Sequence, residues 1–280
     1  MKYKIVADSS SNLYDGYIEN FSSVPLKIIC GDKEYIDIPS LDARKMMNEL
    51  KKIKEKSSTS CPNIFEWRDA FGDADNVFAV TITSGLSGSY SAAMSAKKDY
   101  IAEYPDKKVC VIDSLSAGPE LHLIVDKLCE LISQDLPFET IKKEINEYKK
   151  RTHLFFSLES LDNLAKNGRV NPAVAKIAGI LGIRVIGKAS DEGKLQQLFK
   201  CRGETKTIEK LASEIGKFRI AKGKLIIAHA ENEKAAQLLA GTILKKFPLC
   251  SVKIEACGGL CSYYAEEGGL LIGIEEEPLE

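Results

Sequence analysis

One stretch of the chain, residues 77–97, constrains the fold more than any other because it joins a strand, a glycine-rich turn and a helix. Its first part, VFAVTI, is apolar and largely β-branched, as expected of a buried strand. Its last part, SYSAAMSAK, is rich in alanine, serine and methionine and suits a helix. A strand followed by a turn and a helix is a unit of α/β proteins, so the sequence predicts that class of fold.

The turn itself, residues 83–89, reads TSGLSGS and predicts a site for an anion. The first N–H groups of a helix have no internal partner, and the helix dipole favours negative charge. Glycines let a ligand approach the backbone, and the four hydroxyls add neutral donors. The alternative, that Ser87 or Ser89 only caps the helix, stays open. The turn lacks the lysine of a P-loop and the GxGxxG spacing of a dinucleotide-binding turn.

Length and charge exclude several classes of protein. The chain has 280 residues, enough for one large or two ordinary domains, and 44% of them are hydrophobic, which supports a core. Its 39 basic and 40 acidic residues leave a net charge of −1, which argues against a general nucleic-acid binder. No apolar run approaches the ~18 residues of a membrane span. We therefore expect neither nucleic acid nor a membrane span.

The cysteines indicate a reduced compartment rather than a disulfide framework. Eight are scattered along the chain, and the first residues lack the apolar core of a signal peptide. We therefore expect free thiols and a cytoplasmic protein. Cys257 and Cys261 lack the second Cys/His pair of a zinc site, so no metal is expected.

Strands and helices alternate over the first half of the chain. Strands are expected at 3–7, 77–82 and 108–113, a hairpin at 24–30 and 34–38, and helices from Asp8 to about 20 and at 42–56, 63–71, 89–97, 120–133 and 138–150. This order predicts a mostly parallel sheet with helices on both faces. In such sheets the site lies beyond the carboxyl ends of the strands, where the loops at Asp8, Ser84 and Asp113 would meet.

The basic run at 149–151 marks the expected boundary between an N-terminal domain, residues 1–151, and a C-terminal domain, residues 152–280. The second domain is expected to be a smaller mixed α/β unit. Its predicted elements are strands at 153–157, 184–189, 195–200, 224–230, 251–256 and 270–275, with helices at 158–167, 173–181, 207–218 and 233–247.

A second run of hydroxyls, Ser57 to Ser60, precedes the helix that Asn63 is expected to cap. Two interpretations remain open for it. It is either a second cluster of hydrogen-bond donors or an ordinary polar linker.

Several motifs, in this order, resemble the DegV family. They are VADSSSNL, SSTSCP, ITSGLSGSY, VIDSLSAG, SLDNLAKNGRV, the hairpin before KCRG and the closing GGLLIGI. The resemblance covers nearly the whole chain, and ITSGLSGSY and NLAKNGRV are its most specific pieces. It implies a two-domain α/β protein that binds a long-chain fatty acid and catalyses no reaction itself. Some members are acyl-binding subunits that hold the acid for a separate fatty acid kinase, so such a kinase is the implied protein partner.

By this resemblance, the anion is a carboxylate that loop hydroxyls hold between the domains, and its tail lies in an apolar tunnel. Thr59 and Ser84 match the hydroxyls of the family on the carboxylate side, with Ser60, Thr83 and Gly85 beside them. A buried carboxylate needs several donors. A dozen buried methylenes would contribute roughly 10 kcal/mol before association costs. The segments 173–181 and 155–156 are candidates to line the tunnel, with plain core packing as the alternative.

Two further positions are implied by the resemblance. Arg169 matches the arginine of a GR[IV] motif, which would steer the head group or contact the kinase. Glu266 takes the place of a histidine that helps many members to hold the carboxylate. An acidic group there would repel the ligand unless one of the two is protonated. Tyr263 and Tyr264 nearby are alternative neutral donors.

Two rival functions remain open. The chain would be an acyl hydrolase if Ser84 or Cys61 were a nucleophile, but Ser84 does not lie in a G-x-S-x-G elbow and no histidine occurs in the predicted site loops. Alternatively, it is a ligand-responsive adaptor without a kinase partner.

Overall fold

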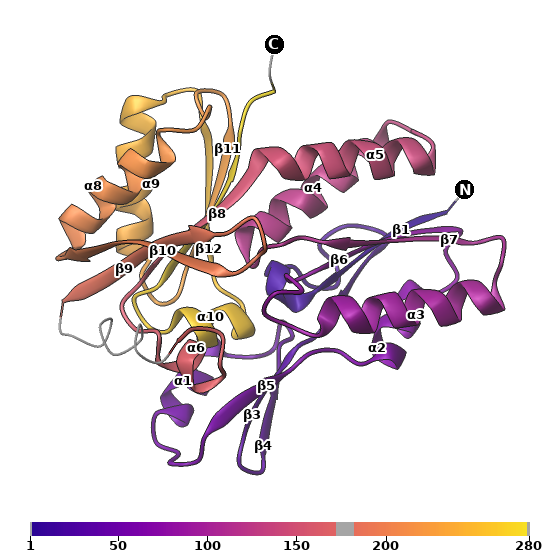
Figure 1. The fold of residues 1–280 in the computed structure, drawn as a ribbon, viewed down its shortest axis with the longest axis horizontal. Coiled ribbons are helices and arrows are strands. Elements are labelled where there is room, and N and C mark those ends of the chain that lie inside the picture. Colours follow the sequence, from indigo (N-terminus) through magenta and orange to yellow (C-terminus); the bar gives the residue numbers. More distant parts are fainter. Residues whose placement is uncertain (1, 172–181, 279–280) are drawn as a thin grey trace.

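The computed structural model describes residues 2–171 and 182–278 of the chain, and their strands form three sheets (Figure 1). The first sheet is parallel throughout, and its order is β2-β1-β6-β7. Its strands are β1 (Tyr3–Asp8), β2 (Phe21–Val24), β6 (Asn76–Thr81) and β7 (Lys108–Asp113). This arrangement confirms the predicted parallel sheet.

Helices cover both faces of the parallel sheet because its buried strands present apolar side chains alternately to the two sides. Ile5 and Phe78 point toward α4 (Pro119–Ser133) and α5 (Phe138–Tyr148). Their neighbours Val6 and Val77 point the other way, toward α2 (Ile64–Phe71) and α3 (Ser89–Glu103). The helices predicted at 63–71, 89–97, 120–133 and 138–150 are confirmed, although α3 continues to Glu103.

The second sheet is mixed, with six strands in the order β10-β9-β8-β13-β11-β12. Only β11 and β12 pair in parallel. Its strands are β8 (Thr152–Leu158), β9 (Ile183–Ala189), β10 (Leu195–Arg202), β11 (Lys224–His229), β12 (Ser251–Ala256) and β13 (Leu270–Glu275). All of them lie after residue 151, and they outnumber the four strands of the parallel sheet. The division into two domains at that residue stays a prediction.

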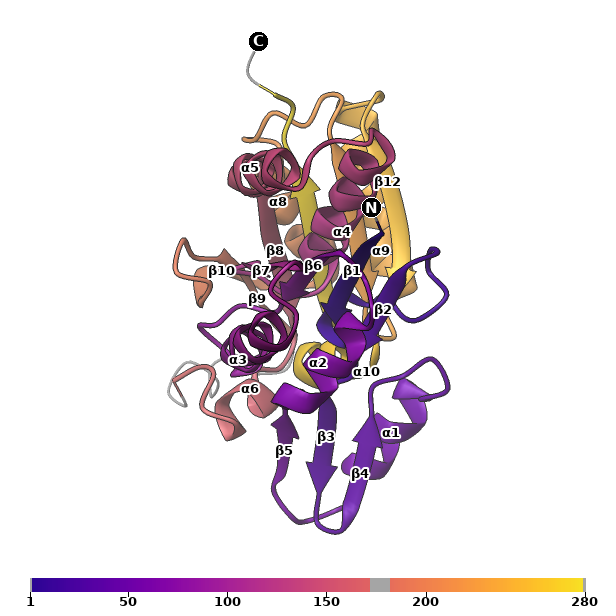
Figure 2. The ribbon, with the colours of Figure 1, turned by 90° about the vertical axis from the view of Figure 1, so that its right-hand side faces the viewer.

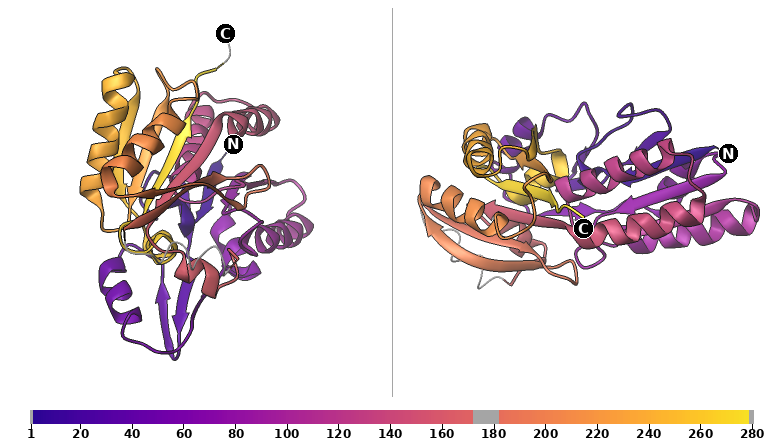
Figure 3. Two further views of the ribbon diagram at one scale, coloured as in Figure 1. Left: turned by 60° about the vertical axis from the view of Figure 1, so that its left-hand side comes forward. Right: turned by 90° about the horizontal axis from the view of Figure 1, so that it is seen from above.

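The two faces of the mixed sheet have different neighbours. One face packs against α8 (Glu204–Ile215) and α9 (Glu233–Lys246) through side chains such as Phe155 and Ile272 (Figure 3). The opposite face carries Leu154, Phe156 and Leu271. This second face is turned toward α4 and the parallel sheet, and it forms one wall of the site described below.

The third sheet is small and antiparallel, in the order β4-β3-β5, and it lies beneath the parallel sheet beside α1 (Ala43–Leu50) (Figure 2). Strands β3 (Lys27–Cys30) and β4 (Lys33–Ile36) are the predicted hairpin. Strand β5 is Ser57–Ser60, so the interpretation of this run as a polar linker is wrong. Its hydroxyl-bearing residues pair along β3, with Thr59 opposite Ile28.

Three predicted helices are shorter in the structure. Only the 3-10 turn Ser9–Ser11 follows β1, because Asn12 adopts a left-handed backbone conformation with φ 61°. Helix α1 ends at Leu50 instead of residue 56, because the chain must turn to pair β5 with β3. Helix α6 covers Asp162–Lys166 rather than residues 158–167, since β8 extends to Leu158. The helix predicted at 173–181 lies outside the described residues.

One helix was not predicted from the sequence. Helix α10 (Gly259–Ala265) begins in a glycine pair, which has low intrinsic helix propensity. Its first N–H groups are satisfied from a distant part of the chain: Asp37 accepts hydrogen bonds from Gly259 N at 2.7 Å and from Leu260 N at 3.0 Å. None of the described helices is long and apolar enough to cross a membrane.

Candidate functional site

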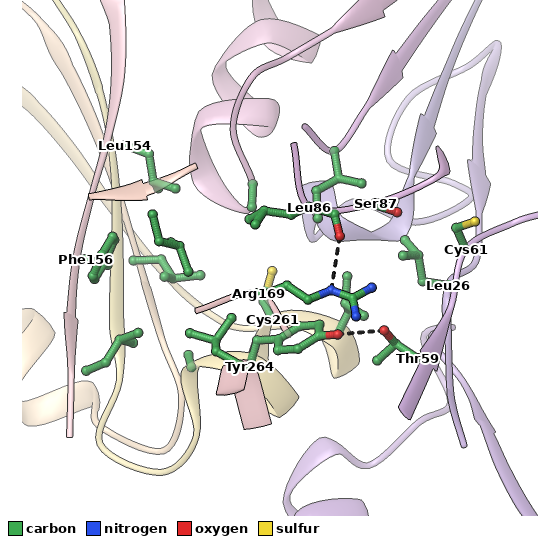
Figure 4. A pocket seen from close by; sticks show the side chains of 18 of the residues that line it. Leu26, Thr59, Cys61, Leu86, Ser87, Leu154, Phe156, Arg169, Cys261 and Tyr264 are labelled. Atoms are coloured by element: carbon green, nitrogen blue, oxygen red, sulfur yellow. Dashed lines mark hydrogen bonds between the residues drawn. The ribbon is translucent and has the colours of Figure 1, made fainter. Parts of the chain in front are cut away.

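A cavity of about 330 Å³ lies where the three sheets approach one another (Figure 4). Strand β5, the turn before α3, strand β8 and helix α10 all contribute to its wall. Its apolar lining is Leu26, Ile82, Leu86, Ala117, Leu154, Phe156, Leu158, Leu164, Leu195, Leu260, Ala265 and Leu271. A cavity of this size and lining suits an apolar ligand with few polar atoms.

The wall on the side of the mixed sheet depends on a glycine. Phe156 of β8 pairs with Gly187 of β9, and a Cβ on Gly187 would lie 2.2 Å from the Phe156 ring. The missing side chain therefore lets the ring lie across the neighbouring strand. Phe156 itself is buried and lines the cavity.

Polar side chains gather around one part of the cavity, between β5 and α10. Thr59 Oγ1 and Tyr264 Oη form a hydrogen bond of 2.6 Å. The guanidinium of Arg169 lies beside this pair, and its Nε donates to the carbonyl oxygen of Leu86 at 3.2 Å (Figure 4). Ser60 and Ser87 complete the hydroxyls of the lining. An arginine flanked by neutral hydroxyls is a suitable environment for a carboxylate.

The turn before α3 is held by a buried carboxyl group at the end of β1. Asp8 Oδ2 accepts hydrogen bonds from Ile82 N at 2.9 Å and from Ser89 Oγ at 2.7 Å. Burial raises the pKa of Asp8 to about 6, and the hydrogen bonds oppose that rise. Asp113, at the end of β7, accepts from Ser84 N at 3.1 Å. The three predicted loops therefore do meet at the carboxyl edge of the parallel sheet.

Some of the predicted site residues line the cavity and others do not. Thr59, Ser60 and Arg169 line the cavity. The described lining does not include Thr83, Ser84 or Gly85. It does include the next three residues of the same turn, 86–88.

The hairpin between β9 and β10 approaches the first part of the turn. Its tip packs directly on Thr83 and Gly85. A Cβ on Gly85 would lie 2.9 Å from the carbonyl oxygen of Glu192, and a Cβ on Gly193 would lie 2.0 Å from Thr83 Oγ1. Thr83 Oγ1 accepts a hydrogen bond from Gly85 N at 3.0 Å, while Ser84 is exposed.

Glu266 faces α6 rather than the cavity. Its Oε1 accepts a hydrogen bond from Asn163 N at 2.9 Å, and burial raises the pKa of its carboxyl group. Glu266 is not among the described residues that line the cavity. The structure therefore does not bring this carboxyl group together with Thr59 and Arg169.

Several lining residues had no signal in the sequence. Leu26, Leu195 and Leu271 lie in or beside strands and look like ordinary core positions, because an apolar side chain carries no mark of whether it faces a neighbour or a cavity. Cys261 is similar, since one thiol in a short glycine-flanked segment predicts nothing specific. The run of hydroxyls in β5 was the one local signal for its side of the site.

The described residues contain no cluster of three or more histidine, cysteine or acidic side chains arranged to hold a metal ion. No histidine is among the described residues that line the cavity. All eight cysteines are free thiols.

Comparison with known proteins identifies the family. The family model described as "Uncharacterised protein, DegV family" matches residues 2–277. A DegV domain-containing protein of Streptococcus pneumoniae is 43% identical over 279 residues, which are 98% of this chain and 99% of the relative. A crystal structure of a DegV family protein from Eubacterium eligens, loaded with heptadecanoic acid, is 43% identical with a TM-score of 0.95 and covers 98% of this chain and 100% of its own.

A second solved structure is equally similar. It is the fatty acid kinase B3 protein of Streptococcus pneumoniae loaded with linoleic acid, which is 43% identical with a TM-score of 0.96. The match covers 99% of this chain and 100% of that chain. The chain therefore belongs to the DegV family.

Proposed function

We propose that this protein binds a long-chain fatty acid, with the carboxylate beside Thr59 and Arg169 and the tail in the apolar cavity. The observation that carries the proposal is the composition of the cavity wall. Its lining is mostly aliphatic and aromatic, and an arginine and hydroxyl groups lie together in one part of it. Similar proteins from Eubacterium eligens and Streptococcus pneumoniae were crystallised with fatty acids.

The physical chemistry of the two ends differs. Each buried methylene of the tail contributes about 0.8 kcal/mol through the hydrophobic effect. The carboxylate loses water on entry, and charge-assisted hydrogen bonds from an arginine offset that cost. Affinity therefore comes chiefly from the tail, and orientation from the head group.

The protein also presents the bound acid to a separate kinase and performs no chemistry itself. This part of the proposal is supported by the similarity to the B3 protein of a fatty acid kinase. It is also supported by the cavity lining, in which Cys61 is present but no described histidine is available as a base. A cytoplasmic location remains part of the same proposal.

Binding is tested by native mass spectrometry of the purified protein and by thermal unfolding of the delipidated protein with palmitate or oleate. We expect a co-purifying acyl chain and a rise in melting temperature with added acid, since a ligand at 100 times its Kd stabilises the folded state by about 2.7 kcal/mol. The absence of both would refute the proposal.

The hydrolase alternative is tested with p-nitrophenyl esters of long-chain acids. We expect no turnover above the uncatalysed rate. Turnover that is lost in Cys61→Ala or Ser84→Ala would establish an enzyme instead. The adaptor alternative is tested by adding a fatty acid kinase catalytic subunit with ATP, where phosphate transfer to the bound acid is the expected result.

A further inference from the structure

Helix α10 presents two consecutive tyrosine hydroxyls to two alternate residues of β5. Tyr263 Oη lies 2.7 Å from Ser57 Oγ, and Tyr264 Oη lies 2.6 Å from Thr59 Oγ1. Residues two apart in a strand point to the same side of it, so both tyrosine hydroxyls meet the same side of β5. The pairs look alike, but their surroundings differ.

The hydrogen bond between Tyr263 and Ser57 has a structural role. The Tyr263 side chain is 0% exposed, and Asn167 Nδ2 donates a further hydrogen bond to the Tyr263 hydroxyl at 2.9 Å. The backbone carbonyl of Tyr263 also accepts from Asn163 Nδ2 at 2.8 Å. Tyr263 thus joins α10, β5 and α6, and it is not among the described residues of the cavity lining.

The Tyr264 pair opens onto the cavity. Tyr264 and Thr59 both line it, and the guanidinium of Arg169 lies next to their hydrogen bond (Figure 4). Burial raises the pKa of the Tyr264 phenol above its ordinary value, whereas the hydrogen bond with Thr59 and the charge of Arg169 oppose the rise. The phenol is therefore protonated at neutral pH and remains a donor.

The Thr59–Tyr264 pair has one hydroxyl hydrogen more than its own hydrogen bond uses, so one donor remains for a ligand. Thr59 and Tyr264 have one O–H hydrogen each, and the bond between their oxygens uses one of the two. The other hydrogen is available to a third group. A carboxylate accepts hydrogen bonds only, so it matches a site that offers one hydroxyl hydrogen beside a guanidinium.

We propose that Tyr264 is a ligand-binding residue which acts as one unit with Thr59, and that this hydroxyl pair with Arg169 selects a carboxylate over a neutral head group. The inference rests on the proposed function. In the pair, one hydroxyl donates to the other, and the second hydroxyl donates to a carboxylate oxygen. Tyr264 thereby sets which kind of lipid is bound, while the apolar wall accepts any tail that fits.

The test compares palmitate with hexadecanol, a neutral lipid of the same chain length, on the delipidated full-length protein. The readout is the ratio of the two Kd values from calorimetric or fluorescence displacement titration. We expect the wild-type protein to prefer palmitate. Tyr264→Phe removes one hydroxyl and keeps the ring, so it should reduce the preference about tenfold, chiefly by weakening palmitate binding.

The matched control is Tyr263→Phe, which removes the neighbouring hydroxyl from the buried pair. It should lower the melting temperature but leave the ratio of Kd values within about twofold of the wild-type ratio. Thr59→Val tests the cavity-facing pair from its other side. Because the two hydroxyls act as a unit, the double variant Thr59→Val/Tyr264→Phe should lose less preference than the sum of the single losses.

The outcomes separate the two proposals. If Tyr264→Phe and Thr59→Val both keep the wild-type ratio of the palmitate and hexadecanol Kd values, this inference is overturned. Fatty-acid binding as proposed above would still stand. An equal loss of preference in Tyr263→Phe also overturns this inference, because the effect would then be structural. A wild-type protein that binds neither lipid refutes the proposed function itself.

Discussion

At the scale of single residues, buried carboxyl groups connect segments that are far apart in the chain. Asp8 links β1 to the turn before α3, and Asp37 links the loop after β4 to α10. Glu120 lies at the start of α4 and accepts a hydrogen bond from Thr152 Oγ1 at 2.8 Å. Each of these groups has its ionised form destabilised by burial, so each couples the fold to pH.

Glu120 gives the clearest pH dependence, because burial raises its pKa to about 7. In the unfolded chain this carboxyl group ionises near pH 4.3. Between those values the folded protein keeps a proton that the unfolded chain has lost, so raising the pH favours unfolding. The stabilising contribution of the protonated group is complete below about pH 4 and is lost by about pH 7.

Glu120→Gln retains an acceptor for Thr152 and removes this titration. Relative to the wild-type protein, the variant should gain about 3 kcal/mol of unfolding free energy between pH 4.5 and pH 8. Urea unfolding at several pH values measures the difference. The exposed Glu144→Gln is the control and should follow the wild-type curve. Parallel curves for Glu120→Gln and wild type would contradict the expectation.

Arg169 is the one charged side chain among the described residues that line the cavity. Replacing it by glutamine keeps a polar side chain but removes the positive charge, so palmitate affinity should fall ten- to a hundredfold. Lys166→Gln, on the same stretch of chain but outside the cavity lining, should leave the affinity within twofold. Calorimetry on delipidated protein measures both, and equal effects of the two substitutions would show that only overall charge matters.

At the scale of elements, α10 contributes more residues to the cavity lining than any other described helix, and its start is stabilised by a residue far away in sequence. Asp37 accepts hydrogen bonds from two of its first N–H groups and from the Tyr14 hydroxyl at 2.9 Å. By contrast, Asp42 caps α1 locally through Lys45 N at 2.8 Å. These two aspartates allow a comparison between a buried long-range cap and an exposed local one.

Asp37→Ala leaves buried donors unsatisfied and should lower the unfolding free energy by about 2–4 kcal/mol. It should also weaken palmitate binding, since α10 carries Tyr264 into the cavity. Asp42→Ala should cost about 1 kcal/mol and leave binding unchanged. Urea unfolding and palmitate titration of both variants provide the measurement. An Asp37→Ala protein as stable as Asp42→Ala would argue against this role for Asp37.

Much of the element order could be predicted because local patterns specify it. Strands β7, β12 and β13 have the predicted bounds, since each is a short apolar run or an alternating one between turn residues. Strand β5 and helix α10 could not be predicted in this way. The hydroxyls of Ser57 and Thr59 in β5 form hydrogen bonds with tyrosines more than 200 residues away, and α10 is capped by Asp37 across the fold. Interactions of that range leave no local pattern.

Long-range contacts also decide which of the predicted site residues reach the cavity. Thr59 and Arg169 line the cavity. Thr83 is buried and lies against the hairpin tip at Gly193, a contact between segments about 110 residues apart that no motif reveals. Whether any of these residues contacts a ligand stays a prediction.

At the scale of the whole molecule, the contact between α4 and β13 joins the parallel sheet to the mixed sheet. Gly273 in β13 lies directly against the first turn of α4, where a Cβ would be 2.6 Å from the backbone carbon of Pro119. Backbone atoms cannot move aside cheaply, so this glycine allows the two layers to approach closely.

Gly273→Ala should therefore force α4 and β13 apart and lower the unfolding free energy by several kcal/mol. Gly241→Ala is the matched control, because Gly241 lies on the exposed side of α9 with nothing within 4 Å of its added Cβ. It should stabilise the protein by about 0.5–1 kcal/mol through helix propensity. Thermal and urea unfolding compare the two, and equal stabilities would refute this role for Gly273.

The wall of the cavity is assembled from positions as far apart as Leu26 and Leu271. Neither half of the chain contains the whole of it. A chimera built from the first half of one family member and the second half of another would therefore surround its lipid with two unrelated surfaces. Preference for chain length or for double bonds would then be inherited from neither parent alone, and engineering it requires exchanging matched residues on both halves together.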